Sequence, residues 1–198
     1  MTPRTEIESY LHTLLDVPRF RDYGPNGVQV EGKDAIGRLV SGVTASLAFI
    51  EAAVEKRADA VLVHHGLFWK GHDGRVTGWM KKRIALLLQH DITLFAYHLP
   101  LDAHALLGNN AQFGQRLKLE ADGRFGDQDL GHIGSPAQPL TTAALAAMLK
   151  FRLGRDPVVA DGAAGRPLGR IAWCTGGAEG FFEAAIAAGA DAYITAAM

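Results

Sequence analysis

Residues Arg38 to Gly66 read RLVSGVTASLAFIEAAVEKRADAVLVHHG, and this stretch determines the class of fold. A strand pattern at 38–43 leads into an amphipathic helix pattern at 46–56, and a second strand pattern follows at 60–64. Strands that alternate with helices of about ten residues indicate crossover units and a mainly parallel sheet. The stretch therefore predicts an α/β protein.

The same pattern occurs a second time. Residues Arg170 to Met198 read RIAWCTGGAEGFFEAAIAAGADAYITAAM and align with 38–66 without a gap, at an offset of 170 − 38 = 132. Phe49 aligns with Phe181, and Asp59 aligns with Asp191. A repeat of this kind predicts two related lobes. We expect them at 1–122 and 123–198, with mainly parallel or mixed sheets flanked by helices, and with the boundary in the Gly- and Asp-rich segment 120–139.

Other elements are predicted on both sides of the first copy. Thr5 and Glu8 have the spacing of a capping box, which predicts a helix over 6–15. The Gly- and Pro-rich segment 19–32 is expected to be an ordered loop with a short strand at its VQV sequence. The remaining expectations are helices at 80–90, 141–153 and 181–188, and strands at 93–98, 157–160, 170–174 and 192–195.

Composition excludes several classes of function. The 198 residues carry a net charge of −1 and a pI near 6.7, so no general attraction to nucleic acids or anionic membranes is expected. No apolar run approaches the roughly 20 residues of a membrane helix, and the first residues do not resemble a signal peptide. Cys174 is the single cysteine, which favours a cytoplasmic location and, in its apolar strand, an inert thiol.

A histidine pair ends the second strand of the first copy. His64 and His65 precede Gly66, and the carboxyl ends of strands in α/β sheets are where ligands usually bind. Imidazole is a common ligand for zinc and similar ions, so the pair is a candidate metal site. Neighbouring strand residues point to opposite faces, so the pair could equally be one core histidine and one exposed histidine. Spacing alone leaves both interpretations open.

Three more polar residues lie at or after the end of the next strand. His98 ends the predicted strand at 93–98, and Asp102 and His104 follow it in the HLPLDAH sequence. A carboxylate beside two imidazoles is what a bridged two-metal site needs, although Asp102 could instead cap a short helix. We interpret His98 and His104 as supporting or structural residues. The segment TGGAEG at 175–180 could hold an anion, but a tight turn is the favoured interpretation.

Several of these motifs together resemble those of a known family. They are YGPNGVQVEG at 23–32, DAVLVHHGLFWKG at 59–71, HLPLDAH at 98–104, GNNAQ at 108–112 and AWCTGG at 172–177. The sequence resembles the NIF-three-like proteins, also called GTP cyclohydrolase I type II homologs. This resemblance implies a two-lobed α/β fold, a toroidal homohexamer and a dinuclear centre of divalent ions such as Zn, Fe or Mn, two per chain. It also implies metal-ligand roles for His64, His65 and Asp102.

The family pattern continues, after the strand at 191–195, to a late H-x-x-x-E motif that completes the metal shell, whereas this sequence ends with Ala196, Ala197 and Met198. Three side chains would then serve ions that each prefer four or more ligands, so we expect weakened or single-metal binding. The leading hypothesis is a metal-dependent hydrolase of an unknown small-molecule substrate. The alternatives are a non-catalytic metal-binding ring or scaffold and an inactive fragment.

Overall fold

The chain forms two compact units, Met1–Leu101 and Asp102–Met198, in a computed structural model that describes residues 1–162 and 165–196. The sequence predicted a boundary after residue 122. That position lies inside strand β7 (Leu119–Phe125), which pairs with β8 (Gly131–Pro136). This pairing keeps residues 102–122 with the second unit. Within the described residues, no helix has the length and apolar character needed to cross a bilayer.

The first unit contains a four-stranded sheet in the order β2-β6-β5-β4. Strands β4, β5 and β6 are parallel, and β2 runs antiparallel to β6. A separate small pair, β1 with β3, is antiparallel. The strands are β1 (Thr2–Pro3), β2 (Gly27–Val30), β3 (Ala35–Ile36), β4 (Leu39–Thr44), β5 (Ala60–His65) and β6 (Thr93–Ala96).

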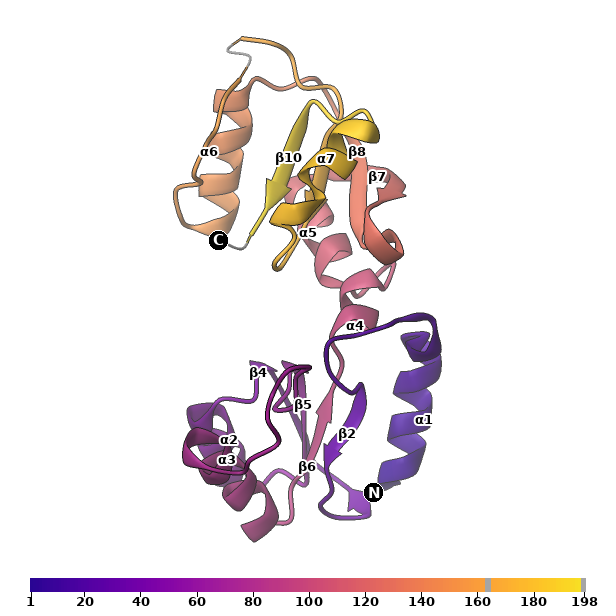
Figure 1. The fold of residues 1–198 in the computed structure, drawn as a ribbon, viewed down its shortest axis with the longest axis vertical. Helices are drawn as coiled ribbons and strands as arrows, with labels where there is room; N and C mark the ends of the chain where they lie inside the picture. Colours follow the sequence, from indigo (N-terminus) through magenta and orange to yellow (C-terminus); the bar gives the residue numbers. More distant parts are fainter. Residues whose placement is uncertain (163–164, 197–198) are drawn as a thin grey trace. The chain divides into compact units, whose positions relative to one another are not determined.

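Helices cover both faces of this sheet (Figure 1). Helix α1 (Arg4–Leu14) packs on one face, where Leu15, Phe95 and Tyr97 are buried. Helices α2 (Leu47–Glu55) and α3 (Gly78–Gln89) pack on the other face through a larger apolar core. Helix α2 begins as predicted, because the Ser46 hydroxyl accepts a hydrogen bond from the Phe49 amide at 3.2 Å. The first unit is therefore a three-layer α/β/α arrangement.

The predicted capping box of the first helix is wrong. Thr5 lies inside α1, whose N-cap position is Pro3, and the Arg4 amide bonds to the Asp34 carbonyl at 2.7 Å. The Glu8 carboxylate instead accepts a hydrogen bond from the Val28 amide at 2.8 Å. Glu8 therefore ties the helix to the edge of the sheet, a contact that the local sequence does not show.

The second unit has its own four-stranded sheet, in the order β10-β9-β8-β7. Strands β9 (Ile171–Cys174) and β10 (Ala192–Thr195) are parallel, and the other pairs are antiparallel. One face packs its core, including Trp173, against α5 (Asn109–Leu117) and α6 (Thr142–Leu153), and the other packs against α7 (Phe182–Ala187). The remaining elements are α4 (Leu99–Ala103) and the 3₁₀ turns η1 (Val17–Arg19), η2 (Asp127–Asp129) and η3 (Glu179–Phe181).

The β7–β8 hairpin occupies most of the segment 120–139, where the sequence predicted a lobe boundary and no strands. The glycines of this segment are unusual in strands, so the sequence did not indicate a hairpin. The structure shows why one of these glycines is required. A Cβ atom at Gly134 would lie 1.9 Å from the Glu120 carbonyl oxygen, so the two strands approach each other too closely for any side chain there. The strand predicted at 157–160 is also wrong, since these residues are described and form no strand.

The two copies of the repeat share their register and their hydrogen bonds. Leu39 pairs with Ala60 in one sheet, and Ile171 pairs with Ala192 in the other. Each copy has an equivalent aspartate, Asp59 or Asp191, whose carboxylate accepts hydrogen bonds from two backbone amides at 2.9 Å. Each carboxylate also forms an ion pair, with a lysine in the first copy and with an arginine in the second. The last two aligned residues, 197 and 198, lie outside the described residues. The α/β class with two related units is thus confirmed.

Candidate metal centre

Three histidines of the first unit meet at the carboxyl ends of neighbouring strands. His64 and His65 end β5, and β6 ends at Ala96, two residues before His98. The parallel pairing of Val63 with Ala96 places these two strand ends side by side. The ring centroid of His64 lies 4.5 Å from that of His65 and 4.9 Å from that of His98. One nitrogen from each of the three rings lies within 4.8 Å of the others, so the cluster could hold a metal ion.

Each ring has its Nδ1 atom in a hydrogen bond. The partners are the Tyr97 carbonyl for His64 at 3.0 Å, the Thr44 hydroxyl for His65 at 3.2 Å and the Asp22 carboxylate for His98 at 2.8 Å. A carbonyl or a carboxylate only accepts, so neutral His64 and His98 carry their proton on Nδ1 and present Nε2 as the basic nitrogen. Histidines that bind metals are usually held in this way.

Gly66 lets the chain turn directly after the pair. The Gln29 side-chain oxygen accepts a hydrogen bond from the Leu67 amide at 2.8 Å, and a Cβ atom at Gly66 would lie only 2.2 Å from that oxygen. Any larger residue would displace Gln29. Beside the rings, a hollow of about 10 Å³ is lined in part by His64, Trp69 and His98. It has room for about one water-sized sphere, far less than a nucleotide needs.

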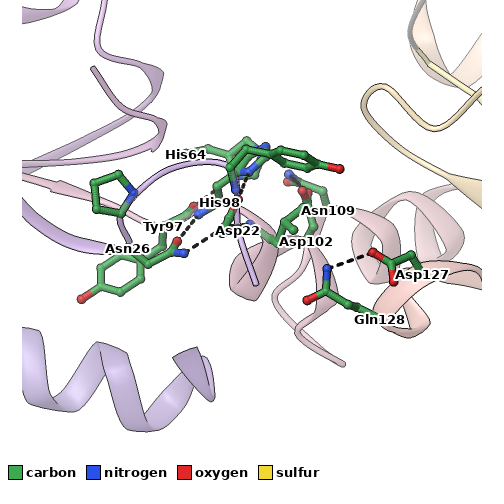
Figure 2. A network of polar contacts seen from close by, with 12 residues as sticks. Asp22, Asn26, His64, Tyr97, His98, Asp102, Asn109, Asp127 and Gln128 are labelled. Carbon is green, nitrogen blue, oxygen red and sulfur yellow. Dashed lines mark hydrogen bonds and ion pairs between the residues drawn. The ribbon is translucent and has the colours of Figure 1, made fainter. Parts of the chain in front are cut away.

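Asp22 is the polar residue of this site that the sequence did not single out. Its side chain is only 3% exposed and lies between Asn26 and His98 (Figure 2). Burial opposes the charged form, but hydrogen bonds from His98, Asn26 and the Leu99 amide outweigh it and lower the pKa of the carboxyl. Asp22 sits in the loop 19–32, where Asp is an ordinary turn residue, so no pattern marks it.

Asp102 and His104 belong to the second unit, whereas the three clustered histidines, His64, His65 and His98, belong to the first. Asp102 lies within the short helix α4 and not at its N-cap, and its carboxylate accepts a hydrogen bond from Asn109 at 2.7 Å (Figure 2). His104 Nδ1 accepts hydrogen bonds from the amides of Leu106 and Leu107, which stabilise a turn. The structure therefore supports a structural role for His104.

Two further expectations concern the end of β9. Cys174 is buried, and burial raises the pKa of its thiol to about 11, so it is a poor nucleophile. The segment after it forms a tight turn in which Gly176 has φ +78. The Thr175 amide donates to the Asn110 side chain at 2.7 Å, so this turn is held to helix α5.

His132 is a buried histidine of the second unit and predicts a pH-dependent stability. Burial, and then the charge of the hydrogen-bonded Arg124, lower its pKa to about 4. Between pH 4 and 6.5 the unfolded chain binds more protons at His132 than the folded chain does. The contribution of neutral His132 to the free energy of unfolding is therefore fully present above pH 6.5 and is lost as the pH falls toward 4. The expected loss is on the order of 3 kcal/mol. Urea unfolding across this range measures it, and a His132→Phe variant should show a shallower slope. Identical profiles would contradict the assignment.

Together, the fold and the cluster define a class: two-unit α/β proteins with an imidazole-rich candidate metal site at the ends of parallel strands. Comparisons with known proteins narrow this class. The family model Duf34/NIF3 (NGG1p interacting factor 3) matches residues 2–198. A "GTP cyclohydrolase 1 type 2 homolog" of Neisseria meningitidis serogroup A is 51% identical over 195 residues, which is 98% of this chain and 78% of the relative.

Other relatives indicate the same family. A protein of the same name from Pseudomonas aeruginosa is 50% identical over 91% of this chain and 72% of its own length. The solved structure of ybgI, a protein of unknown function, has a TM-score of 0.95 at 41% identity, covering 100% of this chain and 79% of that one. TTHA1606 from Thermus thermophilus has a TM-score of 0.87 at 31% identity, covering 100% and 78%. The chain belongs to the Duf34/NIF3 family, so the resemblance found in the sequence is confirmed.

Proposed function

We propose that this protein is a metal-dependent hydrolase of a small molecule, with a divalent ion held by His64 and His65 and with Asp102 as a carboxylate ligand. The observation that carries the proposal is the cluster in which nitrogens from three imidazoles lie within 4.8 Å of one another. The residues fit such an ion, because the rings of His64 and His98 direct a basic nitrogen away from a hydrogen-bonded Nδ1.

When bound, a divalent ion lowers the pKa of a coordinated water and so supplies hydroxide near neutral pH. The chain's own residues hold the site in place. The Tyr97 carbonyl orients His64, and the Thr44 hydroxyl orients His65 from the neighbouring strand. Asn109 orients the Asp102 carboxylate, which would add negative charge to balance the ion.

The names of the relatives suggest the first substrate to test. Several are called GTP cyclohydrolase 1 type 2 homologs, so hydrolytic opening of the purine ring of GTP is the first candidate reaction. The hollow beside His64 and His98 has neither His65 nor Asp102 in its lining, so it does not identify the substrate. We therefore propose a hydrolase without assigning GTP as its substrate, and phosphoesters belong in the same panel.

The test is turnover by the metal-stripped protein after reloading with Zn²⁺, Fe²⁺ or Mn²⁺, over a panel of nucleotides and phosphoesters. We expect metal-dependent hydrolysis of at least one compound, which is lost in a His64→Ala variant and kept in a His90→Ala variant. His90 is an exposed histidine at the end of α3 and serves as the matched control. Bound metal without any turnover would contradict the hydrolase and favour a non-catalytic metal-binding protein.

Assembly is part of the same proposal. The resemblance implies a homohexameric ring, and native mass spectrometry of the 198-residue chain measures the number of subunits directly. A ring without turnover would favour the scaffold interpretation. A monomer would remove the ring from the proposal and leave the metal site to be tested by itself.

A further inference from the structure

We propose that the surface around Trp79, at the start of helix α3, binds single-stranded nucleic acid. We name it the α3 surface, and it consists of Trp79, Lys82 and Arg83 of α3 and of His72 in the loop before the helix. The inference goes beyond the proposed function, because none of these residues is proposed to hold a metal and binding to them requires no ion.

The α3 surface lies in a segment with a local excess of positive charge. Residues 70–90 carry five lysines and arginines and one aspartate, which gives +4 with the histidines neutral, whereas the whole chain carries −1. The aspartate, Asp73, is paired with Arg75 two residues later. Among the residues that the structure describes, Lys82 and Arg83 form no ion pair, so their charges are available to an anionic partner.

Trp79 is held in place with much of its side chain in solvent. Tryptophan is highly buried on average, yet Trp79 is 48% exposed, and α3 buries Met80 and Leu87 in its place. The Arg83 guanidinium lies over the indole ring at 4.6 Å from its centroid. The His72 ring packs against the indole at 6.1 Å between centroids, with the two planes at 71°. A positioned and exposed indole among cations is the kind of platform on which unpaired bases stack.

Helical spacing places both cations beside this ring. Lys82 and Arg83 follow Trp79 by three and four residues, so their side chains lie on the same side of the helix as the indole. Lys81 follows Trp79 by only two residues and points to another side. Lys82 is exposed, so its ammonium group can meet a phosphate while a base stacks on the indole.

A single strand fits the α3 surface better than other polyanions do. Its bases have free flat faces for Trp79, and its phosphates suit Lys82. In a duplex the base faces are already stacked on one another, so the indole would find no partner. An acidic peptide supplies carboxylates but no flat ring. A solvated helix face would explain the two cations, but it would not explain the exposed indole between them.

One loop joins the α3 surface to the histidine cluster. The Trp69 ring lies 4.9 Å from that of His98 between centroids, and the Trp69 carbonyl accepts a hydrogen bond from the His72 amide at 3.0 Å. The His72 ring in turn contacts Trp79. Helix α3 itself packs with α2 on one face of the sheet of the first unit (Figure 1). The α3 surface is therefore connected to the candidate metal centre through residues in direct contact.

The experiment is fluorescence anisotropy of labelled oligo-dT and oligo-rU of about 12 nucleotides, titrated with the full chain in the presence of a chelator. We expect both to bind, with an affinity that falls as salt increases. Trp79→Ala should weaken binding by about 5- to 100-fold, while Trp79→Phe should keep most of it. Lys82→Gln should reduce the slope of log affinity against log salt by about 0.7. Lys81→Gln is the matched control, with a smaller effect expected. Circular dichroism checks that each variant is folded.

Several outcomes would overturn the inference. They are no binding of either oligonucleotide at low salt, unchanged binding in Trp79→Ala, and tighter binding of a duplex of the same length. Equal losses in Lys81→Gln and Lys82→Gln would mean that the basic segment attracts strands without a defined surface. Displacement by poly-glutamate as effective as by unlabelled oligo-dT would assign the surface to acidic peptides instead. Because the chelator removes metal, failure here leaves the proposed hydrolase intact, and a chain that binds no metal would leave this inference intact.

Discussion

A His64→Ala, His65→Ala double variant is expected to lose more than about 100-fold in affinity for Zn²⁺, since losing even an outer partner of a metal ligand typically costs 10–100-fold. The two rings supply two of the three nitrogens that converge at the strand ends. Removing them leaves one imidazole of the cluster, and one imidazole with the proposed Asp102 carboxylate holds an ion only weakly against a chelator. Metal content per chain after dialysis, measured by mass spectrometry, gives the result.

The matched control is a His72→Ala, His90→Ala double variant, which removes the same number of imidazoles from exposed positions of the same unit. It should bind as much Zn²⁺ as the wild type. Equal losses in both double variants would mean that ions bind to histidines without a defined site. The site would also be refuted if the His64→Ala, His65→Ala variant kept a full complement of metal.

Trp173→Ala is expected to destabilise the protein by about 3–5 kcal/mol, the usual cost of deleting a fully buried aromatic side chain. Trp173 is completely buried in the core of the second unit, and its indole N–H donates to the Asn110 carbonyl at 2.9 Å. The substitution leaves a cavity and removes the indole hydrogen bond to that carbonyl. Urea unfolding followed by circular dichroism measures the loss without depending on tryptophan fluorescence.

Trp79→Ala provides the comparison, because Trp79 is 48% exposed at the start of α3 and contacts the Arg83 guanidinium at 4.6 Å. Its loss should cost about 1 kcal/mol or less. If the two tryptophan variants unfolded at the same urea concentration, the assigned core of the second unit would be wrong. Metal uptake by the first-unit cluster offers a second readout, because Trp173 lies outside that unit.

Local patterns were sufficient for the regular elements. The strands β4, β5, β9 and β10, with helix α2 between the first two and helix α7 between the last two, were predicted to within one or two residues, because their apolar periodicity lies in adjacent sequence. The β7–β8 hairpin was missed for the opposite reason. Its glycines at 123, 131 and 134 look like a loop, and only the pairing of the strands shows that they permit a close approach.

By itself, the sequence determined the α/β class, the repeated strand–helix–strand unit and the histidine pair at the end of one strand. All three depend on residues that are close together in the sequence. The tertiary structure alone brought His98 to that pair, through the parallel pairing of β5 with β6. It alone placed Asp22 against His98, 76 residues away in the chain. Such contacts depend on how a loop folds over a strand end, and no local periodicity carries that information.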